Sequence, residues 1–531
     1  MDKKWWTLLA VCTGSFMLLL DVTIVVVAQP AIQSGLHASF SDVQWTLDAY
    51  ALTLAALLLT SGSLADRFGR KRVFTIGLVV FTIGSLLCGV AADPLMLIVS
   101  RSGQGIGGAM MFATGLALLG HSFRGKDRGT AFGIWGTVSG IATALGPSLG
   151  GVITTNWDWR GIFLVNIPIG VFALVITIWR VEESRSPKPA PLDWAGFALL
   201  TGGLVGLVYG LIRASETAWS DAGVIACLAA GGVLLVTFVV VEGKITHPMF
   251  QVSLLRVPTF AGGSISAFAM NGSLYAMMLY LTVYLQDVLG YSAQDAGLRI
   301  SIITLATLVT ATLAGRLSER VAIRWLIGPG LVLVGIGLIV MAGLTGTSTW
   351  THLIPGFIIS GLGSGLVNPP LAATAIGVVP PHQSGMASGA NSTFRQIGIA
   401  TGIAALGTIF ASVIKSQLAT ALPPRLAGSA AGIENAVRQG SIGHMLATLP
   451  VADRAPVALA LRSSFAASLN DLLYVTAGVA LAGAVCALVL IRQKDFVKRD
   501  YGAPAGAGPA GAPGAAAPAA QDSGAAPIAR P

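Results

Sequence analysis

Three ionisable residues of this chain stand in otherwise apolar sequence, where a charge needs a reason. Asp21 lies in "SFMLLLDVTIVVVAQP" (residues 15–30), Asp48 lies in "VQWTLDAYAL", and Arg101 begins "RSGQGIGG". In a bilayer, an ionised side chain costs about 2.5–3.5 kcal/mol on insertion scales, so it must face a watery cavity, pair, or hold a proton. Because burial favours the neutral form of a carboxyl group, Asp21 could load a proton on one side of a membrane and release it on the other. The alternative is a structural hydrogen-bond acceptor.

The other two ionisable residues also have two interpretations each. Arg101 could tune the protonation of a carboxylate in a state-dependent way, or it could be a structural partner of an acid or of backbone carbonyls. Asp48 could bind a cationic substrate or share in proton transfer, or its side chain could reach toward the outer membrane surface. Aromatic and methionine side chains near these residues could line an adaptable apolar cavity, although any one of them could instead face lipid or the core. These substrate-binding candidates are Phe16, Met17, Trp45, Tyr50 and Tyr280.

The elements that must position these residues are membrane-spanning helices. Hydrophobic residues make up 54% of the 531 residues and charged residues only 10%, whereas about 25% of a soluble chain is charged. Apolar runs long enough to cross a bilayer, which takes about 17–25 residues, recur along the chain. Fourteen such runs cover residues 5–28, 43–64, 73–92, 95–119, 129–154, 160–180, 192–213, 221–241, 259–285, 294–315, 324–344, 350–371, 391–414 and 471–491. They are too long for membrane strands and do not alternate, so the sequence predicts an all-α polytopic membrane protein.

The distribution of Lys and Arg predicts the orientation of these helices. Basic residues gather in the connections on the side of Lys3 and Lys4, whereas the short loops opposite hold only Arg160, Arg213 and Arg299. Cytoplasmic loops carry the excess of Lys and Arg, so both termini are expected in the cytoplasm. Arg outnumbers Lys and Ala is abundant, a composition typical of a GC-rich bacterial genome, so a bacterial cytoplasmic (inner) membrane is expected. The net charge of +9 reflects this bias and does not indicate a nucleic-acid partner.

Short internal repeats predict a duplicated architecture. "GSLADRFGR" (62–70) reappears as "GRLSERVAI" (315–323), and "GQGIG" (103–107) resembles "GLGSG" (361–365) at a nearly constant spacing. A six-helix unit repeated once, with two helices inserted between the copies, explains this spacing. The expected parts are an N-terminal six-helix bundle (1–187), two inserted transmembrane helices (188–245), a C-terminal six-helix bundle (246–495) with a long extracytoplasmic loop (415–470), and a low-complexity, disordered cytoplasmic tail (496–531).

Two glycine-containing motifs indicate places where helices turn or approach each other. "GSLADRFGRKR" (62–72) joins two spans, and its glycines allow a close helix approach and a tight turn. "GPSLGG" (146–151) places a proline between glycines inside a span, which permits bending and close packing. An ordinary basic loop and an ordinary kinked helix are the alternatives. The motif residues are Gly62, Asp66, Arg67, Gly69, Arg70, Gly146, Pro147, Gly150 and Gly151.

The same motifs carry a resemblance to a known family. "GSLADRFGRKR" resembles the loop signature of the major facilitator superfamily, "RSGQGIGG" (101–108) its helix-4 motif, and "GIATALGPSLGG" (140–151) the helix-5 motif of its antiporters. "LDVTIVVVAQP" (20–30), "WDWRGIFLVNIP" (157–168) and "YLQDVLGYSAQDAGL" (284–298) resemble motifs of its fourteen-helix drug:proton antiporter family. The resemblance implies two six-helix bundles that rock about a central cavity, a proton-coupling role for Asp21, and a sealing or flexing role for the proline–glycine motif.

The sequence therefore favours a proton-coupled multidrug efflux antiporter that exports lipophilic, cationic or aromatic compounds as a monomer. A dedicated exporter of a self-made antibiotic or lipid is the nearest alternative, followed by a proton-coupled importer and a non-transporting membrane sensor. No GxxxxGK[ST] phosphate loop, metal-ligand cluster or nucleophile–base spacing is present, so neither a cofactor, a bound metal nor an enzymatic activity is expected. The four cysteines all fall in apolar runs and do not form a disulfide framework.

Overall fold

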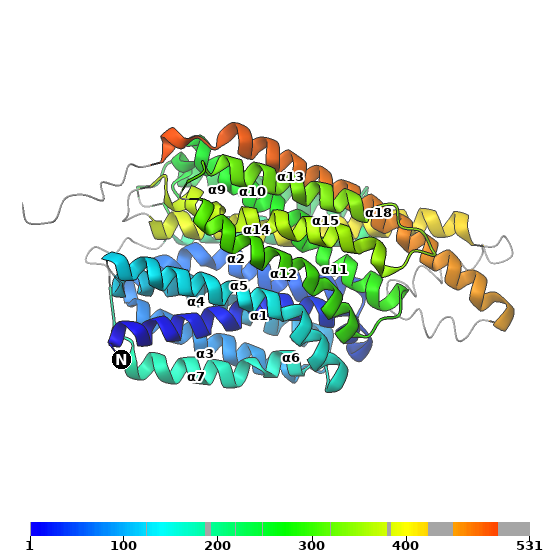
Figure 1. Cartoon of the computed structure of the whole chain (residues 1–531), viewed down its shortest axis with the longest axis horizontal. Helices are drawn as coiled ribbons and strands as arrows, with labels where there is room; N and C mark the ends of the chain where they lie inside the picture. Colours follow the sequence, from blue (N-terminus) through cyan, green and yellow to red (C-terminus); the bar gives the residue numbers. More distant parts are fainter. Residues whose placement is uncertain are drawn as a thin grey trace, which may run out of the picture. The chain divides into compact units, whose positions relative to one another are not determined.

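The computed structural model describes residues 2–123, 125–185, 193–217, 219–246, 248–318, 320–379, 384–422 and 450–496. Its first part contains α1 (Lys3–Leu36), α2 (Phe40–Phe68), α3 (Arg70–Gly89), α4 (Pro94–Ser122), α5 (Gly125–Asn156), α6 (Gly161–Leu164), α7 (Asn166–Arg180), α8 (Trp194–Glu216) and α9 (Ala222–Glu242). Its second part contains α10 (Pro258–Met270), α11 (Ala276–Val283), α12 (Ala293–Leu317), α13 (Arg324–Met341), α14 (Ile354–Ile376), α15 (Ser384–Ala421) and α18 (Val451–Leu490). The helices run alongside one another through most of the molecule (Figure 1).

The helices correspond to the fourteen apolar runs. Thirteen helical stretches among the described residues are long and apolar enough to cross a membrane, and α4, which contains Arg101, packs between them against α2 and α3. The expected span 160–180 is divided, because α6 ends at Leu164 and α7 begins at Asn166. The span expected at 259–285 consists of α10 and α11 with π-helical turns at Asn271–Tyr275 and Tyr284–Val288. The predicted all-α membrane fold is therefore confirmed.

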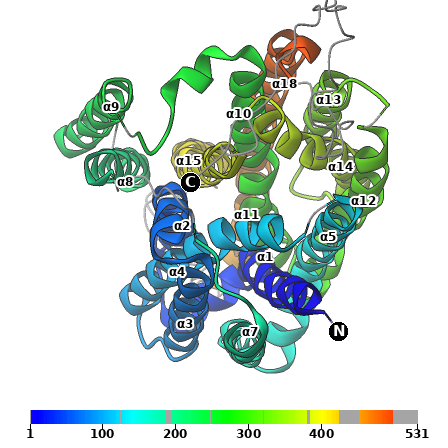
Figure 2. The same ribbon diagram turned by 90° about the vertical axis from the view of Figure 1, so that its left-hand side faces the viewer.

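The helices gather in two bundles around the centre of the structure (Figure 2). In the first bundle, α4 packs on α2 and α3, and α1 packs on α5 and α7. In the second, α14 packs on α12 and α13, and α18 packs on α10, α13 and α15. The bundles meet along two seams, where α5 contacts α12 and α2 contacts α15. Such an arrangement can open at either end of the seams when one bundle rocks against the other.

The inserted helices α8 and α9 pair with each other outside the two bundles. α8 also packs against α2 and α15, so it covers one of the two seams. At the turn between the inserted helices, Asp221 caps α9 by accepting a hydrogen bond from the Val224 N–H, at 3.1 Å. Arg213 Nε donates to the same carboxylate at 3.2 Å, and this hydrogen bond lowers the pKa of Asp221. The hairpin is thus closed by a capping interaction reinforced by opposite charge.

Both bundles contain close glycine contacts between neighbouring helices. In the first bundle, a Cβ at Gly107 of α4 would meet the backbone of Gly77 and Phe81 on α3. In the second, a Cβ at Gly363 of α14 would meet the backbone of Gly330 on α13. Small residues let membrane helices approach backbone to backbone, where dispersion contacts and not the hydrophobic effect hold them together.

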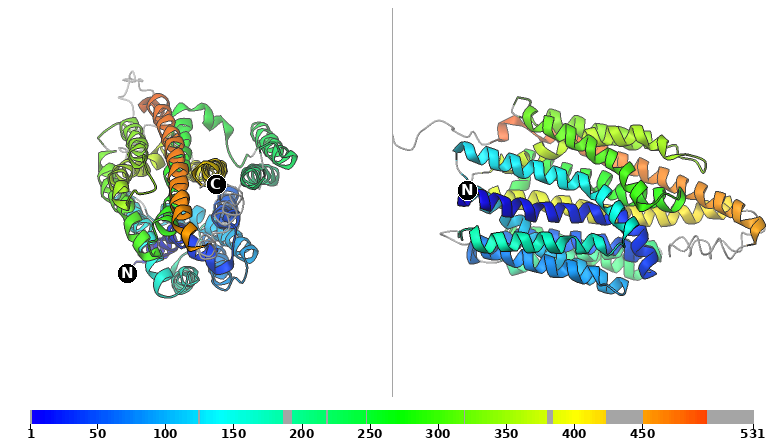
Figure 3. Two further views of the ribbon diagram at one scale, coloured as in Figure 1. Left: turned by 90° about the vertical axis from the view of Figure 1, so that its right-hand side faces the viewer. Right: turned by 60° about the horizontal axis from the view of Figure 1, so that its bottom comes forward.

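The loop expected at 415–470, for which the sequence also predicts helical patches such as "APVALALRSSFAASLND", is helical at both of its ends. α15 continues to Ala421 and α18 begins at Val451, and α18 runs as one long helix in Figure 3. The alanine- and leucine-rich segment 457–470 carries no Gly or Pro that would end a helix. Residues 423–449, and the tail beyond residue 496, lie outside the described residues.

Candidate functional site

A buried ion pair occupies the interior of the first bundle. Asp21 on α1 has no exposed surface, and the side chain of Arg101 on α4 is 1% exposed. Arg101 Nη1 donates to Asp21 Oδ2 at 2.5 Å, and Arg101 Nε donates to the backbone carbonyl of Thr46 at 3.0 Å. The structure therefore brings together the two residues that the sequence singled out for proton coupling. Charges removed from water in this way are stable only when each is paired and hydrogen-bonded.

Three polar side chains complete the environment of the Asp21 carboxylate. Asn166 Nδ2 donates to Asp21 Oδ1 at 3.0 Å, and Gln104 Nε2 donates to the same oxygen at 3.3 Å. Both amides also donate to Ser85 Oγ, at 3.1 and 2.5 Å, and Gln104 Oε1 accepts from Arg101 Nη1 at 2.8 Å. Four helices, α1, α3, α4 and α7, thus converge on one carboxylate.

The sequence reading missed these three partners, although two of them left a signal. Gln104 follows Arg101 by three residues, which places both side chains on the same face of a helix. Asn166 is an isolated polar residue in an apolar run, within a motif that was noted only for its resemblance. Ser85 left no such signal, because a single serine in a membrane helix is common and bonds to its own backbone.

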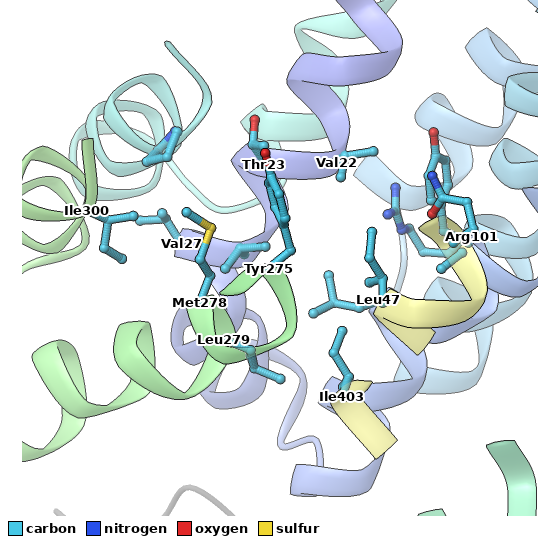
Figure 4. A pocket seen from close by; sticks show the side chains of 16 residues that line it. Val22, Thr23, Val27, Leu47, Arg101, Tyr275, Met278, Leu279, Ile300 and Ile403 are labelled. Atoms are coloured by element: carbon cyan, nitrogen blue, oxygen red, sulfur yellow. The ribbon is translucent and has the colours of Figure 1, made fainter. Parts of the chain in front are cut away.

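A cavity lies between the bundles, beside this ion pair. Figure 4 shows Arg101 on one side of it, with Met278 and Ile300 of the second bundle on the other. The lining residues are Val22, Thr23, Val26, Val27, Leu47, Tyr50, Ala51, Arg101, Pro147, Tyr275, Met278, Leu279, Ile300, Gln396, Ile399 and Ile403. A mostly apolar pocket with a few polar groups is the kind of lining that a lipophilic ligand requires.

Tyr50 links the ion pair to the cavity. Its ring lies under the guanidinium of Arg101, with 4.3 Å between the ring centroid and the guanidinium carbon. The Tyr50 hydroxyl is buried and has no hydrogen-bond partner. An aromatic ring is attracted to a cation that lies over its face. A change in the charge of the ion pair would therefore alter the position of Tyr50, which lines the cavity.

The other substrate-binding candidates do not line this cavity. Met17 is buried inside the first bundle, while Phe16 is partly buried and packs on the main core cluster. Trp45 turns to the inserted helix α8, where its ring centroid lies 6.2 Å from that of Tyr209. Tyr280 lies in the seam between the bundles. In the structure, only Tyr50 of the proposed aromatic and methionine set contacts the cavity.

Asp48 occupies a different environment from Asp21. Its side chain has no exposed surface, it does not line the cavity, and neither of its carboxyl oxygens has a hydrogen-bond partner among the described residues. A carboxyl group without a partner is tolerated in such a place only with its proton bound. The two acids that the sequence singled out are therefore distinct, one in an ion pair and the other isolated.

The seams are closed at one end of the bundles. We call the end at which α1 leads into α2 the distal end, and the end that carries the N terminus the proximal end. At the distal end, Gln44 Nε2 donates to Tyr280 Oη and to the Ile403 carbonyl at 3.1 and 3.2 Å, and Tyr280 Oη donates to the same carbonyl at 2.8 Å. Gln286 Nε2 donates across to the Val27 carbonyl at 2.7 Å. These bonds join one bundle directly to the other.

The proline–glycine motif completes the closure at the distal end. A Cβ at Gly146 or Gly150 would collide with α1, and one at Gly151 would lie 2.5 Å from the Ala293 carbonyl of α12. The prediction that this motif permits close packing thus fits the structure. Ser148, within the motif, hydrogen-bonds Ser301 of α12, with 2.6 Å between the hydroxyl oxygens.

The proximal end is packed more loosely. An added Cβ would meet no atom of the described residues within 4 Å at Gly133 or Gly136 of α5, at Gly315 of α12, or at Gly62 of α2. Gly62 therefore makes no close helix contact in this structure, contrary to the expectation for its motif. The α2–α15 seam stays in contact there through a 3.3 Å bond from Thr393 Oγ1 to the Ala55 carbonyl.

The loop motif between α2 and α3 is held by an acid that the sequence reading did not select. Gly69 has a φ of +110°, a backbone conformation that favours glycine, and confirms the expected turn. Glu183, which follows α7, accepts hydrogen bonds from the backbone N–H groups of Lys71 and Arg72 at 3.0 and 3.2 Å. An acid at the beginning of a helix accepts hydrogen bonds from its free N–H groups and interacts favourably with the positive end of the helix dipole. Arg67 of the same motif is exposed, with its guanidinium over the ring of Phe68. The backbone N–H of Arg70 donates to the Ser184 carbonyl. The side chain of Asp66 lies outside the described residues.

Comparison with known proteins identifies the group to which this architecture belongs. The family model of the Major Facilitator Superfamily matches residues 11–403. The chain is 33% identical over 500 residues to the tetracenomycin C resistance and export protein of Streptomyces glaucescens, covering 92% of this chain and 91% of that protein. It is 32% identical over 462 residues to the multidrug resistance protein Stp of Mycobacterium tuberculosis, covering 86% of each.

Solved structures agree on the fold. A bacterial homologue of the human lysosomal transporter Spinster, in an inward-facing and occupied conformation, superimposes with a TM-score of 0.59 at 19% identity, covering 92% of this chain and 98% of that one. No group of three or more His, Cys, Asp or Glu side chains suited to a metal ion occurs among the described residues. With its two bundles, its central cavity and these relatives, the chain belongs to the major facilitator superfamily of membrane transporters.

Proposed function

We propose that the protein exports lipophilic drugs across the bacterial cytoplasmic membrane in exchange for protons. The observation that carries the proposal is the buried Asp21–Arg101 pair beside an apolar cavity between two bundles. An acid in such a position can be exchanged between a paired, ionised form and a protonated form. The printed names of the relatives, a tetracenomycin C resistance and export protein and a multidrug resistance protein, support drug export.

Both termini face the cytoplasm in this proposal, because Lys and Arg gather at the proximal end. The distal end is then the outer end. Hydrogen bonds from Gln44 and Gln286 close it, while the proximal ends of α5 and α12 have free space around their glycines. The described conformation is accordingly inward-facing, and each monomer carries a complete cavity from which substrate can enter on the cytoplasmic side.

The Asp21 network supplies a way for a proton to change the conformation. In the inward-facing form, the carboxylate is held by Arg101, Gln104 and Asn166. When the cavity opens outward, a proton on Asp21 removes the charge that binds Arg101 and weakens the joint between α1 and α4. The proton-loaded form returns inward, where substrate binding at the cavity wall beside Tyr50 promotes proton release.

The proton gradient provides enough free energy for this exchange. One pH unit corresponds to about 1.4 kcal/mol per proton, and 100 mV of membrane potential provides about 2.3 kcal/mol per charge. Together these values sustain a gradient of an uncharged drug of roughly several hundredfold per proton. The isolated acid Asp48, and the aromatic side chains Trp45 and Tyr280, contribute to substrate binding in conformations in which the α2 seam separates.

A dedicated exporter of a self-made antibiotic is the second candidate. A probable actinorhodin transporter of Streptomyces coelicolor is 35% identical over 430 residues, covering 78% of this chain and 74% of that protein. Together with the tetracenomycin C relative, it supports a narrow substrate range. A panel of unrelated drugs in a pump-deficient host distinguishes the two candidates, because a dedicated exporter protects against one chemical class only.

The decisive experiment uses everted vesicles in a medium that contains a lipophilic dye. Wild-type protein is expected to accumulate the dye when the lumen is acidified, and Asp21→Asn is expected to abolish this accumulation while inserting normally. The matched control is Asp158→Asn. Asp158 lies in the connection just before α6, and 53% of its side chain is exposed, so this variant removes an acid outside the buried site. Full proton-driven uptake by Asp21→Asn contradicts the assignment.

A further inference from the structure

A second arginine within a membrane-spanning stretch, Arg395, is paired differently from Arg101. It lies on α15 within the membrane-spanning stretch Met386–Leu418 and is only half-buried. Arg101 has Asp21 as its counter-ion, whereas Arg395 takes part in none of the ion pairs among the described residues. A cation inside a membrane span without an acid is costly, and by default it marks a functional site whose partner must be named.

The hydrogen bonds of Arg395 leave much of its guanidinium free. Only Nη2 is used, and it donates to Asn368 Oδ1 at 3.0 Å and to the Asn368 carbonyl at 3.5 Å. The three N–H groups on Nη1 and Nε have no partner among the described residues. They are also not among the fully buried polar atoms that lack a hydrogen-bond partner. They therefore reach accessible space, where a ligand can meet them.

The position of Arg395 on α15 directs it toward the central cavity. Ile399 and Ile403, four and eight residues on, lie on the same face of the helix and line the cavity, as does the adjacent Gln396. Tyr275, another lining residue, is close enough to interact electrostatically with the guanidinium. Arg395 thus lies one turn from the apolar cavity wall, toward its proximal side.

We infer that Arg395 and Asn368 form an anion-binding subsite that takes the oxyanion of an amphiphilic ligand whose apolar body fills the cavity. A guanidinium presents a planar fork of N–H groups that matches a carboxylate, sulfonate or phosphate. The ligand supplies the negative charge that the protein lacks at this point. The inference rests on the proposed export function for its physiological meaning, and it adds acidic lipophiles to the expected substrates.

A purely structural role makes a different prediction. Pro369 and Pro370 follow Asn368 in α14, and because proline has no N–H, they leave two carbonyls of the preceding turn without helical partners. Arg395 could simply hold Asn368 at this break. In that case, loss of the arginine would affect every ligand of the cavity alike, whether charged or neutral.

The test measures binding to the purified full-length protein in phosphatidylcholine nanodiscs, without any gradient. The probes are the fluorescent acid 1-pyrenebutyrate and its neutral analogue 1-pyrenebutanamide. Loss of charge-assisted hydrogen bonds in Arg395→Gln is expected to weaken the acid about 10- to 100-fold and to leave the amide unchanged. Arg395→Lys, which keeps the charge but not the planar guanidinium, should bind the acid with an affinity between those of the wild type and Arg395→Gln. The control is Lys415→Gln, which removes an exposed cation from the same helix.

Two outcomes overturn the inference: an equal loss of both probes in Arg395→Gln, or no loss of the acid. Retained amide binding shows in the same assay that the variant is folded. Nanodiscs that contain phosphatidylglycerol identify the source of the oxyanion. If the subsite takes a lipid headgroup, phosphatidylglycerol weakens the binding of pyrenebutyrate to the wild type but not to Arg395→Gln. If it takes a free amphiphilic acid, the lipid leaves the binding of pyrenebutyrate unchanged. Because the assay needs no transport, failure of proton-driven export in vesicles would leave its result standing.

Discussion

The distal closure depends on Gln44, and replacing this residue tests the conformational part of the proposal. Gln44 is fully buried and donates two hydrogen bonds across the seam, to Tyr280 Oη and to the Ile403 carbonyl. Gln44→Leu keeps the volume but removes both donors. A buried hydrogen bond contributes about 0.5–1.5 kcal/mol net, so the outward-closed form should lose about 1–3 kcal/mol relative to the open form. The ratio of the two forms then shifts by about 5- to 150-fold.

The assay follows the outward opening directly. Val27 lines the cavity, and its carbonyl accepts the cross-bundle bond from Gln286. In a protein whose four cysteines, Cys12, Cys88, Cys227 and Cys486, are replaced by alanine, Val27→Cys reports access from outside through its rate of reaction with a membrane-impermeant thiol reagent. Adding Gln44→Leu should raise this rate in whole cells by a factor within the range given above.

Tyr280→Phe provides the internal check, because it removes the donor to Ile403 and leaves Gln44 with one partner fewer. Groups that share one network do not contribute additively, so the double variant should open less than the sum of the single effects. The reasoning is refuted if Gln44→Leu leaves the labelling rate unchanged while the protein remains folded and inserted. That result would mean that Gln44 does not hold the distal end closed.

Two further predictions use other parts of the structure. Gly151→Val should prevent distal closure and abolish export, since a Cβ at Gly151 would press on the Ala293 carbonyl. Gly232→Val should retain export, because Gly232 lies on the inserted helix α9, away from the seams, and an added Cβ there meets no described atom within 4 Å. Equal export by the two variants in everted vesicles would rule out the packing argument. Asp48→Asn should weaken export of cationic dyes more than that of neutral ones, measured as separate KM values; matching losses for both dyes would remove Asp48 from substrate binding.

The membrane spans were predictable because hydropathy and length depend on local sequence alone. The apolar runs and the glycine-rich motifs place each helix within a few residues, and the positive φ of Gly69 confirms the turn that its motif indicates. The extent of the helices was less accessible. α18 extends twenty residues before the apolar run that begins at residue 471, because alanine and leucine continue a helix beyond the membrane as readily as within it.

The partners of the charged residues were less predictable than the residues themselves. Asp21 and Arg101 stand out as charges in apolar sequence, but nothing local shows that Asn166, from a span five helices away from Asp21, completes the site. Trp45 illustrates the opposite failure. Its position in α2 suggested the cavity, yet it packs on Tyr209 of the inserted helix α8, whose place at the seam is fixed only by the tertiary structure.

Proton release from the purified protein tests the central claim most directly. In weakly buffered detergent solution, adding the lipophilic cation tetraphenylphosphonium to the wild-type protein should release protons from the Asp21 site, detected with a pH-indicator dye. Asp21→Asn should bind the cation without this release, since its amide cannot ionise beside Arg101. Equal proton release by the two proteins would show that another group carries the exchanged proton, and would contradict the role assigned to Asp21.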